Sequence, residues 1–399
     1  MPRTTSVRFL CVIALAAMAG SAAAPGAAAA PSSHSRAVCG PAAVHFARCM
    51  SLVVTDDQGT PIVAPLPSGY GPDQFHGAYN LPSSSPGNQT IAIVDAYDDP
   101  TAKADLDVFN STFGLPSFPT CGGGVTTSCF QKVNQNGLPT PLPRKNAGWA
   151  LEISLDVQVA HEICQNCKIL LVEANSNSFA DLAAAVNTAA AQGANAISNS
   201  YSGSDQGPLS AYNHSGIAIT ASSGDNGYGV GSPASFNTVI AVGGTTLTVT
   251  GNNGYGGETV WSGAGSGCSS LNSAQSWQTS LSNWSATGCG TKRGVADVAA
   301  DADPGTGAAV YDTTRYQGRS GWFVVGGTSL SSPLIAAVYA LAGNASSATY
   351  PASIPYAHTS SLHDVTSGSN GNCSTIMCKG AAGYDGPTGV GTPNGTGGF

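Results

Sequence analysis

Short apolar runs alternate with amphipathic helical stretches over most of this 399-residue chain, and this alternation leaves few folds open. Strands that are apolar on both faces and separated by helices indicate a parallel sheet that is covered on both sides. The predicted strands are 91–95, 169–173, 196–200, 216–221 and 239–243, and the predicted helices are 101–113, 148–163, 179–191 and 328–341. The sequence therefore predicts one large α/β domain over residues 68–399.

The first 30 residues have the pattern of a secretory signal peptide. Arg3 and Arg8 precede an apolar run that is too short to span a bilayer, and small residues follow it. Residues 31–67 are rich in Ala, Pro and Ser and are predicted to be a short pro-segment or N-terminal arm. We therefore expect a secreted, extracellular protein.

The chain is acidic and sparsely charged. It has 22 acidic against 14 basic side chains, and charged residues make up 9% of the sequence. This balance argues against nucleic acid and anionic membranes as partners. Few surface ion pairs are available to be lost at low pH, which is consistent with an acidic working environment. The chain is expected to act as a monomer.

Ten cysteines remain once Cys11 leaves with the predicted signal peptide. They fall into five close pairs, Cys39/Cys49, Cys121/Cys129, Cys164/Cys167, Cys268/Cys289 and Cys373/Cys378. An even number in an exported chain favours local disulfides, although ten cysteines allow many connectivities. The Cys164/Cys167 pair could instead be a redox motif or half of a zinc site, but no second C-x-x-C or nearby histidine pair completes a metal tetrahedron.

The segment 326–333, Gly-Gly-Thr-Ser-Leu-Ser-Ser-Pro, is a candidate nucleophile site. A strand ends before it, two glycines allow a sharp turn, and Ser329 stands where the next helix opens. The unpaired N–H groups of a helix N-terminus would favour an oxyanion beside Ser329 Oγ. Alternatively, Ser329 is only the N-cap. Pro333 favours a functional reason, because a proline inside a helix removes a hydrogen bond.

Two acids of the predicted helix over 148–163 lie on its apolar face. A helical wheel places Glu152 and Asp156 about 40° apart within an apolar arc. The polar face is predicted to hold Ser154, Gln158, His161 and Glu162. Two ionised carboxylates directed at a core or cleft repel one another, so we expect them to share a proton. Such a pair keeps one member neutral and leaves the other available as a base at acidic pH. The alternative is a solvated charge pair.

Three further acids stand in glycine-rich turns. Asp225 follows the strand over 216–221 in the sequence Ser-Ser-Gly-Asp-Asn-Gly, which by itself is typical of an Asx-turn. Asp364 and Asp385 are separated by glycine-rich backbone and could form an oxygen cage for a hard cation, or simply two turns.

In their order along the chain, the Glu-x-x-x-Asp pair, the Asp225 segment, the Gly-Gly-Thr-Ser motif and the Asp364/Asp385 region resemble the sedolisin family of serine-carboxyl peptidases, of the subtilisin-like clan. The similarity runs from about residue 70 to 393 and includes 232–235, 242–245 and 293–298. It implies a subtilisin-like parallel sheet flanked by helices on both faces in a single catalytic domain. It also implies a secreted endopeptidase that hydrolyses peptide bonds of protein or peptide substrates at acidic pH.

The resemblance assigns roles to the candidate residues. Ser329 would be the nucleophile, Glu152 its general base, and Asp156 the partner that orients and tunes Glu152. Asp225 would share the oxyanion hole with the Ser329 N–H. An aspartate donates a hydrogen bond there only when it is protonated, so activity is expected to follow a bell-shaped profile below neutral pH.

The resemblance also implies one structural Ca²⁺. Its ligands would be Asp364, Val365 (carbonyl), Ala381 (carbonyl), Gly383 (carbonyl) and Asp385. Ala381 stands where the family often has glycine, which matters little to a carbonyl ligand. Sedolisins commonly carry a long folded pro-domain, whereas only residues 31–67 fill that place here.

Two other functions remain open from the sequence. A subtilisin-type peptidase would use Asp95, His161 and Ser329, but none of the seven histidines is followed by Gly-Thr and His161 is predicted on the polar helix face. A catalytically inactive, calcium-stabilised secreted binding protein is the second, because a fold does not guarantee its function. The presence of every catalytic role favours the endopeptidase.

Overall fold

The computed structural model describes residues 1–2 and 34–399. The predicted signal peptide, apart from its first two residues, lies outside the described residues. Within the described part, no helix has the length and apolar character needed to cross a bilayer.

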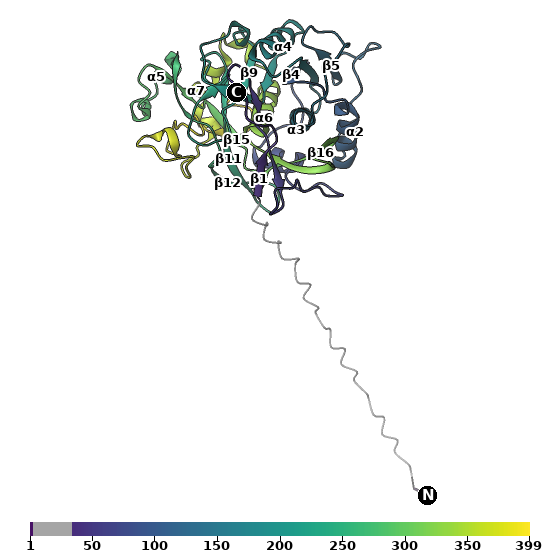
Figure 1. Ribbon diagram of the computed structural model, residues 1–399. Coiled ribbons are helices and arrows are strands. Elements are labelled where there is room, and N and C mark those ends of the chain that lie inside the picture. Colours follow the sequence, from purple (N-terminus) through teal and green to yellow (C-terminus); the bar gives the residue numbers. More distant parts are fainter. Residues whose placement is uncertain (3–33) are drawn as a thin grey trace. The chain divides into compact units, whose positions relative to one another are not determined.

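An eight-stranded, mostly parallel sheet lies at the centre of the domain (Figure 1). Its order is β12-β11-β9-β7-β4-β6-β5, and β15 also pairs with β11. All neighbours are parallel except β11 and β12. The bounds are β4 (Thr90–Ala96), β5 (Phe130–Asn134), β6 (Lys168–Ala174), β7 (Ala196–Asn199), β9 (Ala218–Ser222), β11 (Ile240–Val249), β12 (Tyr255–Val260) and β15 (Val298–Asp301). The five predicted strands are all present, but β11 runs past residue 243 because its second half pairs with β12.

Helices cover both faces of this sheet, as predicted. The chain passes from β4 through α2 (Ala102–Phe113) to β5, from β5 through α3 (Ala147–Ile163) to β6, and from β6 through α4 (Phe179–Ala191) to β7. Helix α3 packs against α2 and strand β16 (Ala308–Tyr316), whereas α4 packs against β4 and β6. Helix α6 (Thr328–Ala342) packs beside α3 (Figure 1). The remaining helices are α1 (Pro72–Ala78), α5 (Ser276–Thr279) and α7 (Ile354–Ala357).

Helix α3 has no solvent-facing side, and the prediction of a polar face on it is wrong. Ser154, Gln158, His161 and Glu162 are all buried. Strand β16 (Ala308–Tyr316) and α2 cover this side of the helix. Gln158 exchanges two hydrogen bonds with the Tyr311 backbone, at 2.7 and 2.9 Å. Ser154 Oγ donates to Asp99 Oδ2 at 3.1 Å. Ser154 and Gln158 therefore pair with protein groups instead of water, whereas neither ring nitrogen of His161 has a hydrogen-bond partner among the described residues.

Residues from His34 onward pack into the same compact unit as the rest of the domain. β1 (His34–Ala37), β3 (Leu52–Thr55), β17 (Arg319–Gly326) and β16 form a four-stranded sheet. β2 (Arg48–Cys49), β8 (Tyr201–Ser204) and β10 (Gly231–Ser232) form a three-stranded sheet. Two pairs complete the set, β13 (Gly267–Ser273) with β14 (Lys292–Val295) and β18 (Leu362–His363) with β19 (Thr392–Pro393). The segment of residues 34–55 thus contributes strands to two sheets.

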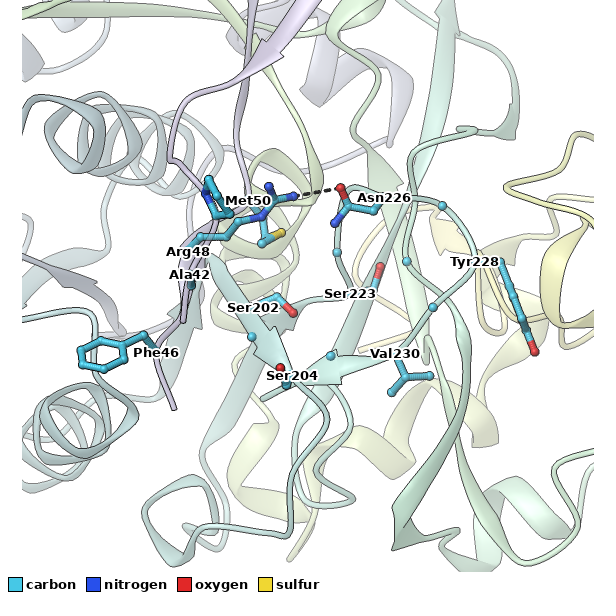
Figure 2. A pocket seen from close by; sticks show the side chains of 17 residues that line it. Ala42, Phe46, Arg48, Met50, Ser202, Ser204, Ser223, Asn226, Tyr228 and Val230 are labelled. Carbon is cyan, nitrogen blue, oxygen red and sulfur yellow. Dashed lines mark hydrogen bonds between the residues drawn. The ribbon is translucent and has the colours of Figure 1, made fainter. Parts of the chain in front are cut away.

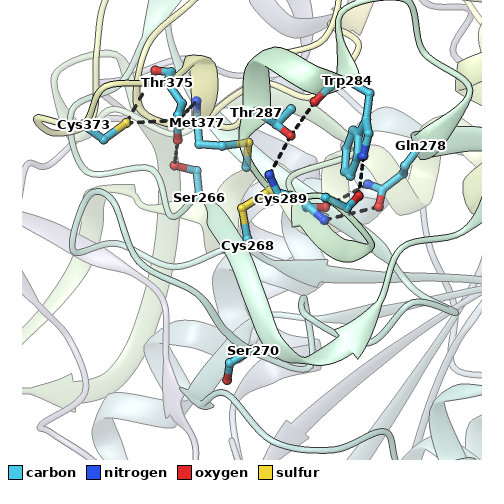
Figure 3. Close-up of a disulfide and its surroundings, with 12 residues drawn as sticks. Ser266, Cys268, Ser270, Gln278, Trp284, Thr287, Cys289, Cys373, Thr375 and Met377 are labelled. Carbon is cyan, nitrogen blue, oxygen red and sulfur yellow. Dashed lines mark hydrogen bonds between the residues drawn. A yellow bond between two sulfur atoms is a disulfide. The ribbon is translucent and has the colours of Figure 1, made fainter.

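Five disulfides join the close cysteine pairs that the sequence suggested. Cys164 and Cys167 are both buried and bonded to each other, at the end of α3. Figure 3 shows the Cys268–Cys289 bridge, which ties β13 to the loop after Trp284. These bridges close short loops in regions with little regular structure.

Candidate active site

Ser329 lies in the first turn of α6. The helix begins at Thr328 and Gly327 is the capping residue, so the reading of Ser329 as a simple N-cap is wrong. Gly327 has φ of 96°, and a Cβ there would lie 2.6 Å from Asp225 Oδ2. Only glycine fits this turn without strain. Ser329 is buried, and its Oγ donates to the Ser200 carbonyl at 3.2 Å.

Three carboxyl groups gather behind Ser329. Glu152 and Asp156 lie on α3, and Asp95 lies near the end of β4. All three are fully buried, and none of their carboxyl oxygens has a hydrogen-bond partner among the described residues. Burial raises the pKa of Glu152 and of Asp156 well above the usual range, and the charge of Asp95 raises both further. Burial also raises the pKa of Asp95 to about 8. The cluster therefore holds protons at pH values where exposed carboxyls have lost theirs.

The nucleophile and the predicted base come from different elements that the fold brings together. The hydroxyls of Ser329 and Ser51 lie beside Glu152 and lower its pKa by stabilising the ionised form. Neither completes a well-formed hydrogen bond to the carboxylate. The Ser200 hydroxyl has the same effect on Asp156. Glu152 is thus the acid that faces the nucleophile, and Asp156 lies one helical turn further on.

Asp225 lies on the loop after β9, against the start of α6. Its Oδ1 accepts hydrogen bonds from the Thr328 N–H and the Thr328 hydroxyl, both at 2.8 Å. Burial raises the pKa of Asp225 to about 7, although the bonds from Thr328 and the charge of Arg48 lower it. Within the described residues Oδ2 accepts no hydrogen bond, and it lies beside Gly327. A proton on Oδ2 would therefore point to the same region as the N-terminal N–H groups of α6.

A pocket of about 360 Å³ opens next to these residues (Figure 2). Arg48 and Met50, of the N-terminal segment, form one side, and the loop that carries Asn226 and Tyr228 forms the other. Ser202 of β8 also lines it. Arg48 Nη2 donates to Asn226 Oδ1 at 3.0 Å across the pocket. A cavity of this size beside a nucleophile suits one side chain of a peptide.

Sequence reasoning had considered Asp95 only as the partner of a histidine. His161 is buried, packs against Phe118 with 4.0 Å between the ring centroids, and makes no hydrogen bond to Asp95 or Ser329. Burial lowers the pKa of His161 to about 3. Asp95 instead joins the two acids of α3. Its position at the carboxyl end of a central parallel strand, where ligands bind in such sheets, was the signal that could have found it.

Both predicted calcium carboxylates accept a hydrogen bond from the backbone of the loop of residues 381–383. Asp364 Oδ2 accepts the Gly383 N–H and Asp385 Oδ2 accepts the Ala381 N–H, each at 2.9 Å. Val365 and Asp385 are buried, whereas Asp364 is exposed. Carboxylate and carbonyl oxygens are the ligands that Ca²⁺ prefers. The donor set therefore fits a hard cation.

Known proteins are similar to this chain over most of its length. Residues 143–372 match the subtilase family. The chain is 29% identical to sedolisin from Pseudomonas sp. (strain 101), over 84% of this chain and 60% of that protein. It is 30% identical to kumamolisin from Bacillus sp. (strain MN-32), over 82% of this chain and 63% of that protein. The chain thus spans less than two thirds of the length of these two relatives.

A solved structure is also similar to this chain. The complex of Pseudomonas sedolisin, a serine-carboxyl proteinase, with two molecules of pseudo-iodotyrostatin matches with a TM-score of 0.66 and 27% identity. The match covers 82% of this chain and 96% of that one. The family match takes in α3, the Asp225 loop and Ser329, over more than half of the chain. The chain therefore belongs to the subtilase family and is similar to the sedolisins.

Proposed function

We propose that this protein is a secreted serine-carboxyl endopeptidase that hydrolyses peptide bonds of proteins at acidic pH. The observation that carries the proposal is the position of Ser329 beside Glu152, in a buried cluster of acids and without a histidine. A carboxylate base works where a histidine base would be protonated.

Each catalytic residue has a defined task. Glu152 takes the proton of Ser329 Oγ while that oxygen attacks the substrate carbonyl. The Ser329 N–H and a proton on Asp225 Oδ2 stabilise the oxyanion. Glu152 then returns the proton to the leaving amine, and a water molecule repeats the sequence on the acyl-enzyme. Burial and the charge of Asp95 raise the pKa of Glu152, and Asp156 is the partner that orients Glu152.

The pH range follows from two of these groups. Asp225 donates only while protonated, so activity is lost as pH rises through its pKa of about 7. On the acid side, activity is lost when the cluster of Glu152, Asp156 and Asp95 becomes fully protonated. Because the charges of these acids repel one another, the cluster loses its first proton at lower pH than its second and third. The proposed bell-shaped profile below neutral pH requires that this first proton, taken from Glu152, is lost below the pKa of Asp225.

The Asp-His-Ser alternative lacks support. The pKa of His161 is about 3 and its ring packs on Phe118, so it would neither hold nor exchange a proton with Ser329 near neutral pH. Five disulfides support an oxidising, extracellular location. We further propose that the protein acts as a monomer.

One structural Ca²⁺ would be held by Asp364, Asp385 and the carbonyls of Val365, Ala381 and Gly383. The ion would tie the β18 segment to the loop near the C-terminus. We expect a chelator to lower the melting temperature and added Ca²⁺ to restore it, as scanning calorimetry of Ser329→Ala would measure. An unchanged melting temperature after dialysis against the chelator would contradict this site.

The proposed function is tested by digestion of a denatured protein between about pH 2 and 9. Ser329→Ala, Glu152→Ala and Asp225→Ala should each lower kcat by about 10²-fold or more. Glu152→Gln and Glu162→Gln are a matched pair, because both residues are buried on α3 and only Glu152 faces Ser329. Glu162→Gln should keep most of the activity. Full activity of Glu152→Ala at about pH 4 would show that the base is wrongly assigned.

A further inference from the structure

Pro333 changes the hydrogen bonding of the nucleophile's own main chain. It lies inside α6, four residues after Ser329. The N–H at that position of a helix normally donates to the carbonyl four residues earlier, and proline has no N–H. The Ser329 carbonyl therefore lacks its usual helical partner, although the residue is fully buried. Because an unpaired buried carbonyl costs free energy, another donor is expected beside it.

Ser200 supplies this donor. It directly follows β7, at the carboxyl end of a central parallel strand, and it is fully buried. Its hydroxyl donates to the Ser329 carbonyl at 3.4 Å, and its own carbonyl accepts the Ser329 hydroxyl at 3.2 Å. The two serines thus hold each other through both their side chains and their main chains.

Further hydroxyls of β7 and β9 bond to the first turns of α6. The Ser222 hydroxyl donates to the Thr328 carbonyl at 2.8 Å. The Thr220 hydroxyl lies 3.2 Å from the carbonyl and 3.0 Å from the hydroxyl of Ser332, and the Ser198 hydroxyl lies 3.0 Å from the Ser332 hydroxyl. Side chains two residues apart on a strand point to the same face, which explains why both strands present two such groups to the helix.

The main chain around Ser200 is held firmly. The preceding residue, Asn199, donates through Nδ2 to the Thr220 carbonyl at 2.9 Å. The following residue, Tyr201, donates through its hydroxyl to Asn199 Oδ1 at 2.7 Å. All of these groups are fully buried. Rotation of its own side chain is therefore the main freedom left to Ser200.

The Ser200 hydroxyl also lies beside Asp156. Burial, and then the charges of Asp95 and Glu152, raise the pKa of Asp156, whereas the Ser200 hydroxyl lowers it by stabilising the ionised form. A hydroxyl has one proton, so it donates either to the Ser329 carbonyl or to the Asp156 carboxylate. An ionised Asp156 is the stronger acceptor, and a protonated Asp156 leaves the hydroxyl to the nucleophile.

We propose that Ser200 is a positioning residue for the reaction, whose hydroxyl replaces the helical bond that Pro333 removes and so fixes Ser329 while its proton is taken. The inference rests on the proposed peptidase function. Ser200 is not among the residues that line the 360 Å³ pocket, so it acts through Ser329 and not on the substrate. Loss of its hydroxyl is therefore expected to lower kcat and to leave KM unchanged.

Ser200→Thr and Ser200→Val are the matched test, because their side chains have nearly the same shape and only threonine keeps a hydroxyl. With a short peptide substrate, kcat of Ser200→Val should be about ten-fold lower than kcat of Ser200→Thr, at similar KM. Equal kcat of the two variants, or a difference confined to KM, would overturn the inference.

A second pair adds no volume to the buried site. Ser200→Ala and Ser198→Ala each remove one buried hydroxyl from neighbouring positions of the same strand region, and only Ser200 bonds to the main chain of the nucleophile. Ser200→Ala should lower kcat by about ten-fold, whereas Ser198→Ala should keep most of the activity. Equal losses in the two variants would contradict the assignment.

The pH profile distinguishes positioning from a general loss of stability. Without the Ser200 hydroxyl, the pair of Glu152 and Asp156 loses a donor that stabilises its negative charge. The acid limb of kcat/KM should therefore lie at higher pH in Ser200→Val than in Ser200→Thr. A lower activity at every pH with the acid limb in place would indicate a purely structural role and would overturn the inference.

The bond to the carbonyl can also be measured without activity. Ser329→Ala keeps the main-chain carbonyl, and Pro333→Ala restores the N–H that the helix would donate to it. In a Ser329→Ala background, Ser200→Ala should lower the melting temperature, and it should lower it less when Pro333→Ala is also present. Equal decreases with and without Pro333 would show that the hydroxyl does not serve this carbonyl.

The outcomes also separate this inference from the proposed function. Cleavage of the peptide by the unaltered protein, with equal kcat for Ser200→Thr and Ser200→Val, would overturn the inference alone. Absence of cleavage by the unaltered protein at every pH would overturn both.

Discussion

At the scale of single residues, the proposed pH dependence of this site turns on which oxygen of Asp225 carries the proton. Thr328 occupies Oδ1 with two hydrogen bonds, so the proton is directed to Oδ2, next to the oxyanion position. The group can donate only below its pKa of about 7. In the proposed mechanism, Thr328 therefore acts as a positioning residue for this proton.

Asp225→Asn tests this role, because an amide donates a hydrogen bond at every pH. We expect lower kcat at about pH 5 but no loss of the remaining activity as pH rises through 7. A profile of kcat/KM against pH measures both effects. Thr328→Val is the control, since loss of one bond to Oδ1 should raise the pKa of Asp225 and move the alkaline limb upward. An Asn variant with the alkaline limb of the unaltered protein would contradict the assignment.

Asp95→Asn tests the third carboxyl of the cluster. Among the neighbouring charges, that of Asp95 has the largest effect on Glu152 and Asp156, and it raises the pKa of both. Because the pKa of Asp95 is about 8, its carboxyl is protonated over the acid limb, so Asp95→Asn should keep the position of that limb in a profile of kcat/KM against pH. A clear shift of the acid limb would show that Asp95 is ionised there and would contradict this assignment.

At the scale of elements, a buried ion pair joins the end of β14 to the start of β15. Arg293 Nη1 donates to Asp297 Oδ1 at 2.6 Å, and a second bond links Nη2 to Oδ2. The Ala241 N–H and the Tyr356 hydroxyl also donate to Asp297, each at 2.7 Å. One carboxylate therefore connects three parts of the chain around β11, which supports the edge of the sheet near the site.

Loss of this carboxylate should be costly. Asp297→Ala leaves Arg293 buried without its partner, and we expect the free energy of unfolding to fall by about 3–5 kcal/mol. Asp107→Ala is the control. The side chain of Asp107 is 54% exposed, and an exposed ion pair such as the one it forms with Lys103 contributes about 1 kcal/mol at most to the free energy of unfolding. Urea unfolding of both variants in a Ser329→Ala background measures the difference. Equal losses would contradict the role of Asp297.

At the scale of the whole molecule, buried carboxyls outside the site link stability to pH. Burial raises the pKa of Glu173 to about 9, although Lys132 lowers it, and burial with the charge of Asp99 raises the pKa of Asp312 to about 9. Because these values exceed the pKa of an unfolded carboxyl, the folded state binds the protons more tightly. Their contribution to stability is complete below about pH 4 and is lost as pH rises through 9.

The melting temperature of Ser329→Ala should therefore be higher at about pH 4 than at about pH 9. Asp312→Asn should reduce this difference, since an amide has no proton to lose, and Asp107→Asn should leave it unchanged. Scanning calorimetry at both pH values measures the effect. A melting temperature that rises with pH would contradict the burial of these groups as acids.

Much of the fold could be predicted from the sequence, because strands and helices depend on periodicities within a few residues. The predicted bounds of α4 agree with the structure, and α2, α3 and α6 differ from prediction by one residue at one end. The prediction of a polar face on α3 was wrong because other elements of the fold cover that side of the helix. Whether Ser154 or His161 meets water depends on β16 and Phe118, which no helical wheel contains.

The candidate site was likewise predictable from the sequence only in part. The residue types and their local settings can be read along the chain: a serine after a glycine turn, two acids one helical turn apart, and an aspartate after a strand. That Asp95 joins those acids, and that Met50 lies against Ser329, follows from the folded arrangement alone. Such contacts join residues far apart in the chain, and their free energy appears only once the sheet has brought the strand ends together.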